Sequence, residues 1–81
     1  MATVDYDSYF VKAFGKLDKS VKVQVEKALA KVIDNPEIGK PMRYARKGTR
    51  EIYVGSFRLS YAYLAQENKI IILNLYHKDE Q

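Results

Sequence analysis

Apolar residues recur at helical spacing in the first half of the chain and at strand spacing in the second half. Residues 9–17 predict a first helix, and a side-chain oxygen of Asp7 or Ser8 is placed to cap its free N–H groups. A second helix is predicted with Ser20 as its N-cap. Apolar residues mark one face of each helix: Tyr9, Phe10, Ala13, Phe14 and Leu17 in the first, and Val21, Val25, Ala28, Leu29, Val32 and Ile33 in the second.

The helical half ends at Asn35-Pro36, because the residue before a proline is pushed out of helical geometry. Residues 37–41 then form a linker that contains a glycine and a second proline. Residues 2–6 are compatible with a short strand at the start of the chain. Residues 70–75 are apolar on both faces, which predicts a central, well-covered strand.

The segment around Gly55-Ser56 predicts a β-hairpin with these two residues as its turn. Val54 then pairs with Phe57, and the strand faces follow by alternation. One face is apolar and carries Ile52, Val54, Phe57, Leu59, Tyr61 and Tyr63, whereas the other is more polar and carries Glu51, Tyr53, Arg58, Ser60 and Ala62. We expect an α+β fold of one domain, residues 1–81, in which an N-terminal helical hairpin packs on a small twisted antiparallel sheet.

Composition narrows the possible functions of this short chain. Its 14 Lys and Arg exceed its 10 Asp and Glu, and the net charge of +4 favours acidic partners such as nucleic acid or an acidic protein. The absence of cysteine and the single histidine exclude a disulfide, a thiolate zinc site and a multi-histidine metal site, and we expect no cofactor. The apolar runs are too short to span a bilayer and no signal peptide is evident, so the expected location is the cytoplasm.

Arg58 is the first candidate for chemistry, since no phosphate-loop, dinucleotide or zinc motif is present. A guanidinium on a rigid strand can hold two phosphate oxygens and stabilise charge that builds up during cleavage. A cross-strand pair with Glu51, or stacking on Tyr53, is the structural alternative. We expect the strand that ends at His77 to lie beside this polar face, where the histidine could donate a proton, although a solvated strand end is the simpler interpretation.

Basic and aromatic residues alternate before the hairpin, which suits single-stranded RNA and suits an exposed charged loop equally well. Lys78 is a further candidate for a phosphate contact, or a solvated terminal side chain. Tyr61 and Tyr63 are assigned to the core or its rim. The predicted RNA-binding residues are Arg43, Arg46, Lys47, Arg50, Tyr53 and Tyr76.

An ordered set of short motifs resembles the RelE/ParE toxin superfamily of type II toxin–antitoxin systems over nearly the whole chain. These motifs are Asn35-Pro36, Gly39-Lys40-Pro41-Met42, Lys47-Gly48, Tyr53-Val54-Gly55-Ser56-Phe57-Arg58-Leu59-Ser60-Tyr61 and His77-Lys78. The resemblance implies two helices on a twisted antiparallel sheet and an acidic antitoxin as the cognate partner. For RelE-type members it also implies metal-independent cleavage of messenger RNA codons in the ribosomal A site.

The mechanism implied by the resemblance uses the RNA 2′-hydroxyl as the nucleophile. The protein then positions the strand, removes a proton, stabilises the phosphorane and protonates the leaving oxygen. By resemblance, Arg58 stabilises the phosphate and His77 is the general acid of the YoeB-like branch. Lys78 takes the place of an arginine used in the RelE branch.

The chain departs from the RelE pattern at two positions. These positions are usually basic in RelE, but Glu51 and Tyr53 occupy them here. Glu51 is therefore either the catalytic base or the ion-pair partner of Arg58. The C-terminal tyrosine that orients RNA in RelE has no counterpart, and Tyr76 or Tyr53 is the candidate substitute.

Three functions stay open at this stage. The leading hypothesis is a toxin that cuts messenger RNA on the ribosome and so inhibits translation. The second is a ParE-like toxin that binds and poisons DNA gyrase, and the third is a degenerate member that only binds its antitoxin. Arg58 with His77 favours the nuclease, whereas the missing basic pair and C-terminal tyrosine weaken it.

Overall fold

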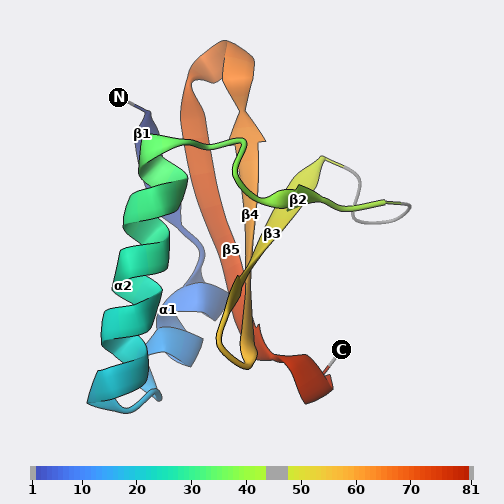
Figure 1. The fold of residues 1–81 in the computed structure, drawn as a ribbon. Helices are drawn as coiled ribbons and strands as arrows, with labels where there is room; N and C mark the ends of the chain where they lie inside the picture. The colour runs from blue at the N-terminus through green and yellow to red at the C-terminus, as the bar shows by residue number, and fades with distance from the viewer. Residues whose placement is uncertain (1, 44–47, 81) are drawn as a thin grey trace.

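The computed structural model describes residues 2–43 and 48–80, in which two helices lie on one face of a five-stranded sheet (Figure 1). The elements are β1 (Thr3–Tyr6), α1 (Ser8–Gly15), α2 (Lys19–Asp34), β2 (Lys40–Pro41), β3 (Thr49–Val54), β4 (Phe57–Leu64) and β5 (Lys69–His77). Short 3-10 turns follow β4 and β5 at Ala65–Glu67 and Lys78–Glu80. The predicted α+β fold is confirmed. None of the helices in the described residues is long and apolar enough to cross a membrane.

The sheet has the strand order β1-β5-β4-β3-β2 and is mixed rather than antiparallel throughout. Strands β3, β4 and β5 pair antiparallel as predicted, β2 adds an antiparallel strand that was not predicted, and β1 pairs parallel with β5. A parallel neighbour needs a long crossover connection, and residues 7–68 supply one through both helices. Strand β2 lies within the predicted linker, and its Pro41 is tolerated because β2 is an edge strand.

The turn at Gly55-Ser56 fixes the register of the central hairpin. Val54 pairs with Phe57 and Tyr53 pairs with Arg58, which confirms the predicted register. Gly55 has a φ of 59°, a left-handed value that this turn requires and that glycine adopts without a steric penalty. The two faces of the hairpin are therefore those that the alternation predicts.

Both helices begin at an aspartate. Asp7 caps α1 by accepting from the Tyr9 N–H at 2.9 Å, as predicted. The predicted cap of α2 is wrong: Asp18 holds that position and accepts from the Val21 N–H at 3.0 Å, while Ser20 already lies inside the helix. The hydrogen bond from the Val21 N–H is the main cause that lowers the pKa of Asp18.

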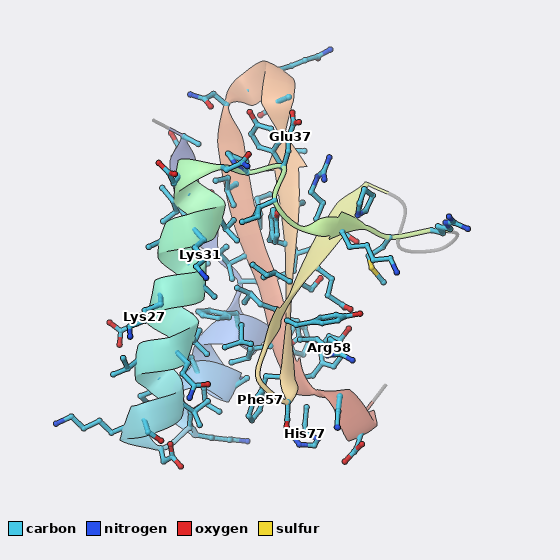
Figure 2. The ribbon with its side chains drawn as sticks, viewed as in Figure 1. Lys27, Lys31, Glu37, Phe57, Arg58 and His77 are labelled. Carbon is cyan, nitrogen blue, oxygen red and sulfur yellow. The ribbon has the colours of Figure 1, made fainter. Side chains whose placement is uncertain are left out.

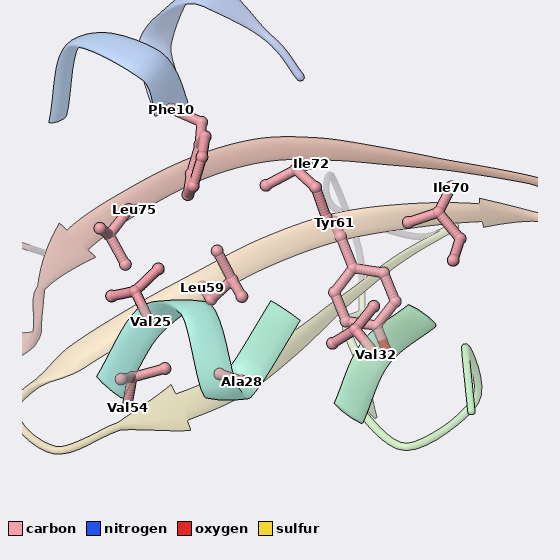
Figure 3. Close-up of a cluster of buried hydrophobic side chains, with 10 residues drawn as sticks. All are labelled: Phe10, Val25, Ala28, Val32, Val54, Leu59, Tyr61, Ile70, Ile72 and Leu75. Atoms are coloured by element: carbon pink, nitrogen blue, oxygen red, sulfur yellow. The ribbon is translucent and has the colours of Figure 1, made fainter. Parts of the chain in front are cut away.

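The core lies between the helices and the sheet (Figure 3). Its buried side chains come from both helices and from β3, β4 and β5: Phe10, Val25, Ala28, Val32, Val54, Leu59, Tyr61, Ile70, Ile72 and Leu75. Tyr9, which the helical pattern assigns to the same stripe as Phe10, is instead 74% exposed. It precedes Phe10 by one residue, which turns it about 100° round the helix axis.

Strand β5 changes phase along its length. The register between β4 and β5 shifts between Ser60 and Tyr61, which leaves Leu73 as an extra residue in β5. This bulge reverses the alternation, so that Ile72 and Leu75 both face the core. The bulge also decides the face of every residue from there to the end of the strand.

The linker between α2 and β2 is held by two side chains of the sheet. The buried Tyr61 hydroxyl accepts from the Gly39 N–H and donates to the Pro36 carbonyl, each at 2.8 Å. Arg50 Nη1 donates to the Glu37 and Gly39 carbonyls at 3.0 and 2.8 Å. A Cβ on residue 39 would lie 2.6 Å from the Tyr61 hydroxyl oxygen, so glycine is required there. Burial raises the pKa of Tyr61, which keeps its phenol neutral.

We predict that Tyr61→Phe lowers the free energy of unfolding by about 1–3 kcal/mol, because the buried Gly39 N–H loses its acceptor while the ring volume stays almost constant. Urea denaturation followed by circular dichroism measures this change. Tyr63→Phe, in the same strand and half-buried, is the matched control and should cost less. Equal losses in the two variants would show that the hydroxyl of Tyr61 does not hold the linker.

Candidate functional site

The polar face of the sheet gathers side chains from three neighbouring strands. Tyr53 of β3 lies opposite Arg58 of β4, and Arg58 in turn lies opposite Tyr76 of β5. Glu51 shares this face because it precedes Tyr53 by two residues. Figure 2 shows Arg58 on the side of the sheet away from α2. The helices cover the other face, which leaves this one for a ligand.

Contacts link these four residues into one cluster. The Arg58 guanidinium carbon lies 3.7 Å from the centroid of the Tyr53 ring, in a cation–π contact. Arg58 Nε lies 4.0 Å from Glu51 Oε1, and the Tyr76 hydroxyl donates to Glu51 Oε2. Both structural alternatives for Arg58, the cross-strand pair and the stacking, are therefore present together.

Glu51 is the buried member of the cluster, with 6% of its side chain exposed. Among the residues whose burial is described, it is the single charged side chain in the buried class. A buried carboxylate is costly unless it is paired and hydrogen-bonded, and Arg58 and Tyr76 meet both needs. The alternation of the hairpin places Glu51 on the polar face, but the sequence does not show this burial.

An open depression of about 530 Å³ lies over the cluster. Its walls are Lys40, Pro41, Met42 and Arg43 on the β2 side, and Glu51, Tyr53 and Arg58 on the hairpin side. Three cations and one carboxylate line it, so its potential favours an anion. The Tyr53 ring is 60% exposed and offers a stacking surface for a base. The depression can therefore hold a phosphate beside a carboxylate and an aromatic ring.

The strand that ends at His77 lies directly beside β4, as expected, but the His77 side chain lies on the other face of the sheet from Arg58. His77 pairs with Phe57, and their rings meet edge to face with centroids 5.4 Å apart. The bulge in β5 sets this orientation, and a strand that is apolar on both faces gives no alternation from which to predict it. The role of His77 in catalysis stays a prediction.

Lys78 follows His77 in the 3-10 turn. Its backbone N–H donates to the Ser56 carbonyl at 2.8 Å, and its side chain is exposed. This hydrogen bond ties the turn after β5 to the turn of the hairpin. The side chain is free to reach an anion, and its phosphate contact stays a prediction.

The predicted RNA-binding residues are spread over different surfaces. Arg43 and Tyr53 line the depression. Tyr76 is connected to it by the hydrogen bond to Glu51, which also lines the depression. Arg50 belongs to the linker, because its Nη1 donates to two linker carbonyls. Arg46 and Lys47 lie outside the described residues.

The sequence prediction missed two parts of the surface. Lys40 lines the depression although it lies within residues 37–41, which are predicted to form only a linker, and Met42 just after the linker lines it too. A second groove, of about 480 Å³, lies between α1 and β5 and includes Lys12 and Lys16. The four-residue spacing of these lysines was the available signal, and such spacing is also typical of a solvated helix face.

The family comparison agrees with this geometry. The family model for the ParE toxin of type II toxin–antitoxin system, parDE, matches residues 4–81. The chain belongs to this family. The predicted membership of the RelE/ParE toxin superfamily is thus confirmed. No curated protein sequence shows significant similarity to the chain.

Solved structures share the fold over nearly the full length of the chain. A chain of the intact E. coli RelBE toxin–antitoxin complex is 22% identical, with 95% of this chain and 96% of that chain covered and a TM-score of 0.81. A chain of the RelBE2 toxin–antitoxin complex from Mycobacterium tuberculosis is 27% identical, with 94% and 96% covered and a TM-score of 0.82. The YoeB/ParE toxin from Agrobacterium tumefaciens is 8% identical, with 93% and 96% covered and a TM-score of 0.82.

We predict that Glu51 and Tyr76 are strongly coupled. A double-mutant cycle of Glu51→Gln and Tyr76→Phe, measured by urea denaturation, should give a coupling free energy of about 1.5–3 kcal/mol, the range for a hydrogen bond to a charged group. The exposed ion pair of Asp5 and Lys69, at 3.0 Å, is the control and should give a much smaller coupling. Equal coupling in both cycles would contradict the account of a buried, hydrogen-bonded carboxylate.

Proposed function

We propose that this toxin cuts messenger RNA on the ribosome, without a metal, at the depression over Arg58. The observation that carries the proposal is the Glu51 carboxylate, which is buried beside a guanidinium on the floor of a basic depression. A carboxylate within reach of a bound ribose can accept a proton, and the adjacent guanidinium is suited to hold a phosphate. The exposed Tyr53 ring adds a stacking surface for a base.

Glu51 is assigned as the general base in this reaction. It takes the proton of the 2′-hydroxyl, and the 2′-oxygen forms a bond to the adjacent phosphorus. The bond from phosphorus to the 5′-oxygen of the next nucleotide breaks. The products are a 2′,3′-cyclic phosphate and a 5′-hydroxyl, so that no water is consumed in this step.

Arg58 is assigned to stabilise the charge that develops on the phosphorane oxygens. Its stacking on Tyr53 and its contact with Glu51 restrict the guanidinium before substrate binds. A group that is already oriented needs little reorganisation at the moment of reaction. The polar face of the sheet would thereby act as a rigid phosphate clamp.

Tyr76 is assigned to protonate the leaving 5′-oxygen, because it lies on the same face as Arg58 whereas His77 does not. The phenol gives its proton to the leaving oxygen and takes back the proton that Glu51 has just accepted, through their hydrogen bond. Protons therefore balance over one turnover. His77 and Lys78 are left to contact RNA rather than to transfer a proton.

The proposed partners are the ribosome with its messenger RNA and a cognate acidic antitoxin. Support for the antitoxin comes from the similar chains found in RelBE and RelBE2 toxin–antitoxin complexes. An acidic antitoxin segment complements the net charge of +4. The proposed compartment is the cytoplasm, where ribosomes and messenger RNA are present.

Inhibition of DNA gyrase by binding alone is the second candidate. The observation that favours it is the place of His77, which deprives the Arg58 cluster of the imidazole expected as its acid. A ParE-like toxin needs no proton transfer, and Arg58 would then be part of a binding surface. The polar face must therefore transfer protons in the nuclease candidate, whereas it need only bind a protein surface in the gyrase candidate.

We predict that Arg58→Ala lowers the rate of ribosome-dependent messenger RNA cleavage by about 10²–10³-fold, the usual loss when one donor to a developing anion is removed. Glu51→Gln and Tyr76→Phe should each cost about 10² or more, as expected for groups that transfer protons. Primer extension on a defined message in a translating extract measures cut sites and rates. His77→Ala should cost much less than Tyr76→Phe.

Lys31→Ala is the matched control for the loss of one cation, since Lys31 lies on α2 (Figure 2) and is exposed. Circular dichroism and antitoxin binding establish that each variant is folded. Full cleavage by Arg58→Ala would remove the proposed site. A parallel assay tests the wild-type toxin for gyrase-linked DNA breaks. Such breaks without any RNA cuts would contradict the nuclease function and support gyrase inhibition.

A further inference from the structure

A second concave surface lies between α1 and the end of β5, on the helix side of the sheet. Tyr9 and Lys12 of α1 form one wall together with Lys16, the residue that caps the end of this helix, and Phe57 and His77 of the sheet form part of the other wall. The groove measures about 480 Å³. It is separate from the depression over Arg58, because Phe57 and Arg58 are consecutive residues of β4 and point to opposite faces.

The groove combines an exposed aromatic ring with positive charge. Tyr9 is 74% exposed, although it is an aromatic residue on a short amphipathic helix. Lys12 and Lys16 follow at three and seven residues from Tyr9, which places all three on the same side of α1. Within the described part of the chain, no carboxylate lines the groove. Exposed rings next to cations are the features that bind single-stranded nucleic acid.

His77 is held in a defined orientation at this groove. The backbone N–H of Asp79 donates to His77 Nδ1 at 3.2 Å, and the Phe57 ring lies edge to face against the imidazole. When the imidazole is neutral, Nδ1 is therefore the acceptor and Nε2 carries the proton. When it is charged, Asp79 Oδ2, at 3.4 Å from Nδ1, accepts from that nitrogen. Either way, Nε2 remains a donor for a ligand.

We propose that the groove between α1 and β5 binds a second segment of the single-stranded RNA that is cut at Arg58. A base stacks on Tyr9, Lys12 and Lys16 contact phosphates, and His77 Nε2 donates to a phosphate or ribose oxygen. That this RNA is also the substrate strand rests on the proposed nuclease function. Binding of single-stranded RNA in the groove does not depend on that function.

The end of β5 connects the two surfaces. The Tyr76 hydroxyl belongs to the Arg58 cluster, and both Tyr76 and the next residue, His77, line the groove. Consecutive strand residues point to opposite faces, so a strand of RNA that bends round the end of the sheet contacts both. This continuity, with the exposed ring and the two lysines, favours RNA over an acidic protein segment as the occupant.

The test uses the full chain and a 2′-O-methyl RNA decamer, which cannot be cut by 2′-hydroxyl attack, in fluorescence anisotropy titrations between 50 and 200 mM salt. The double variant Lys12→Ala/Lys16→Ala should bind about 10-fold more weakly than wild type. Its slope of log affinity against log salt should fall by about 1.4, since each phosphate contact on a single strand contributes about 0.7. Tyr9→Ala should weaken binding at every salt concentration, and Tyr9→Phe should restore it.

Lys27→Ala/Lys31→Ala is the matched control, because it also removes two exposed lysines four residues apart, from α2 (Figure 2). Equal losses in the two double variants would mean that only net charge matters and would overturn the proposal. Unchanged RNA binding by the groove variant, together with weaker binding of the antitoxin, would assign the groove to a protein instead. Groove-dependent binding by a wild-type chain that cuts no message on ribosomes would support RNA binding in the groove and would contradict the nuclease function.

Discussion

The structure depends on the ion pair and the hydrogen bond that stabilise one buried carboxylate, that of Glu51. Glu51 lies on β3, and it is held by Arg58 on β4 and by Tyr76 on β5. These contacts tie three strands together on the face that the helices do not cover. Removing either partner would leave a buried charge incompletely paired, which costs far more than the net contribution of an intact pair. The same arrangement concentrates a proton acceptor, a guanidinium and a phenol in one place, so the element that constrains the sheet also supplies its chemistry.

A second constraint shapes the rim of that site. The Tyr61 hydroxyl and Arg50 fix the linker on the helix side of the sheet, and the linker leads directly into β2. Strand β2 pairs with Arg50 and Glu51, which brings Lys40 and the residues after it to the edge of the depression. The core residue Tyr61 therefore controls the position of cations that a ligand would meet. Packing and site geometry are linked through a single buried phenol.

Local patterns predicted those parts of the molecule in which a local rule is decisive. The two-residue turn and the alternation after it gave the register of the hairpin and the polar face with Arg58, because a turn of that length permits few pairings. The side chain of His77 could not be placed, because residues 70–75, apart from Asn74, are apolar on both faces and give no alternation that would reveal the bulge. The parallel pairing of β1 with β5 and the burial of Glu51 depend on tertiary packing, which a local sequence pattern does not predict. Asp18 and Ser20 are two residues apart and both can cap a helix, so the preference for Ser20 placed the start of α2 too late.

The central claim is that the polar face positions RNA so that a 2′-hydroxyl attacks the neighbouring phosphate. The most direct test replaces that one hydroxyl by hydrogen, at the nucleotide before the cut, in a message programmed into ribosomes with the wild-type toxin. The account predicts that the bond after the 2′-deoxy nucleotide stays intact while the all-ribose message is cut there, leaving a 2′,3′-cyclic phosphate. Cleavage of the same bond in the 2′-deoxy message would contradict it.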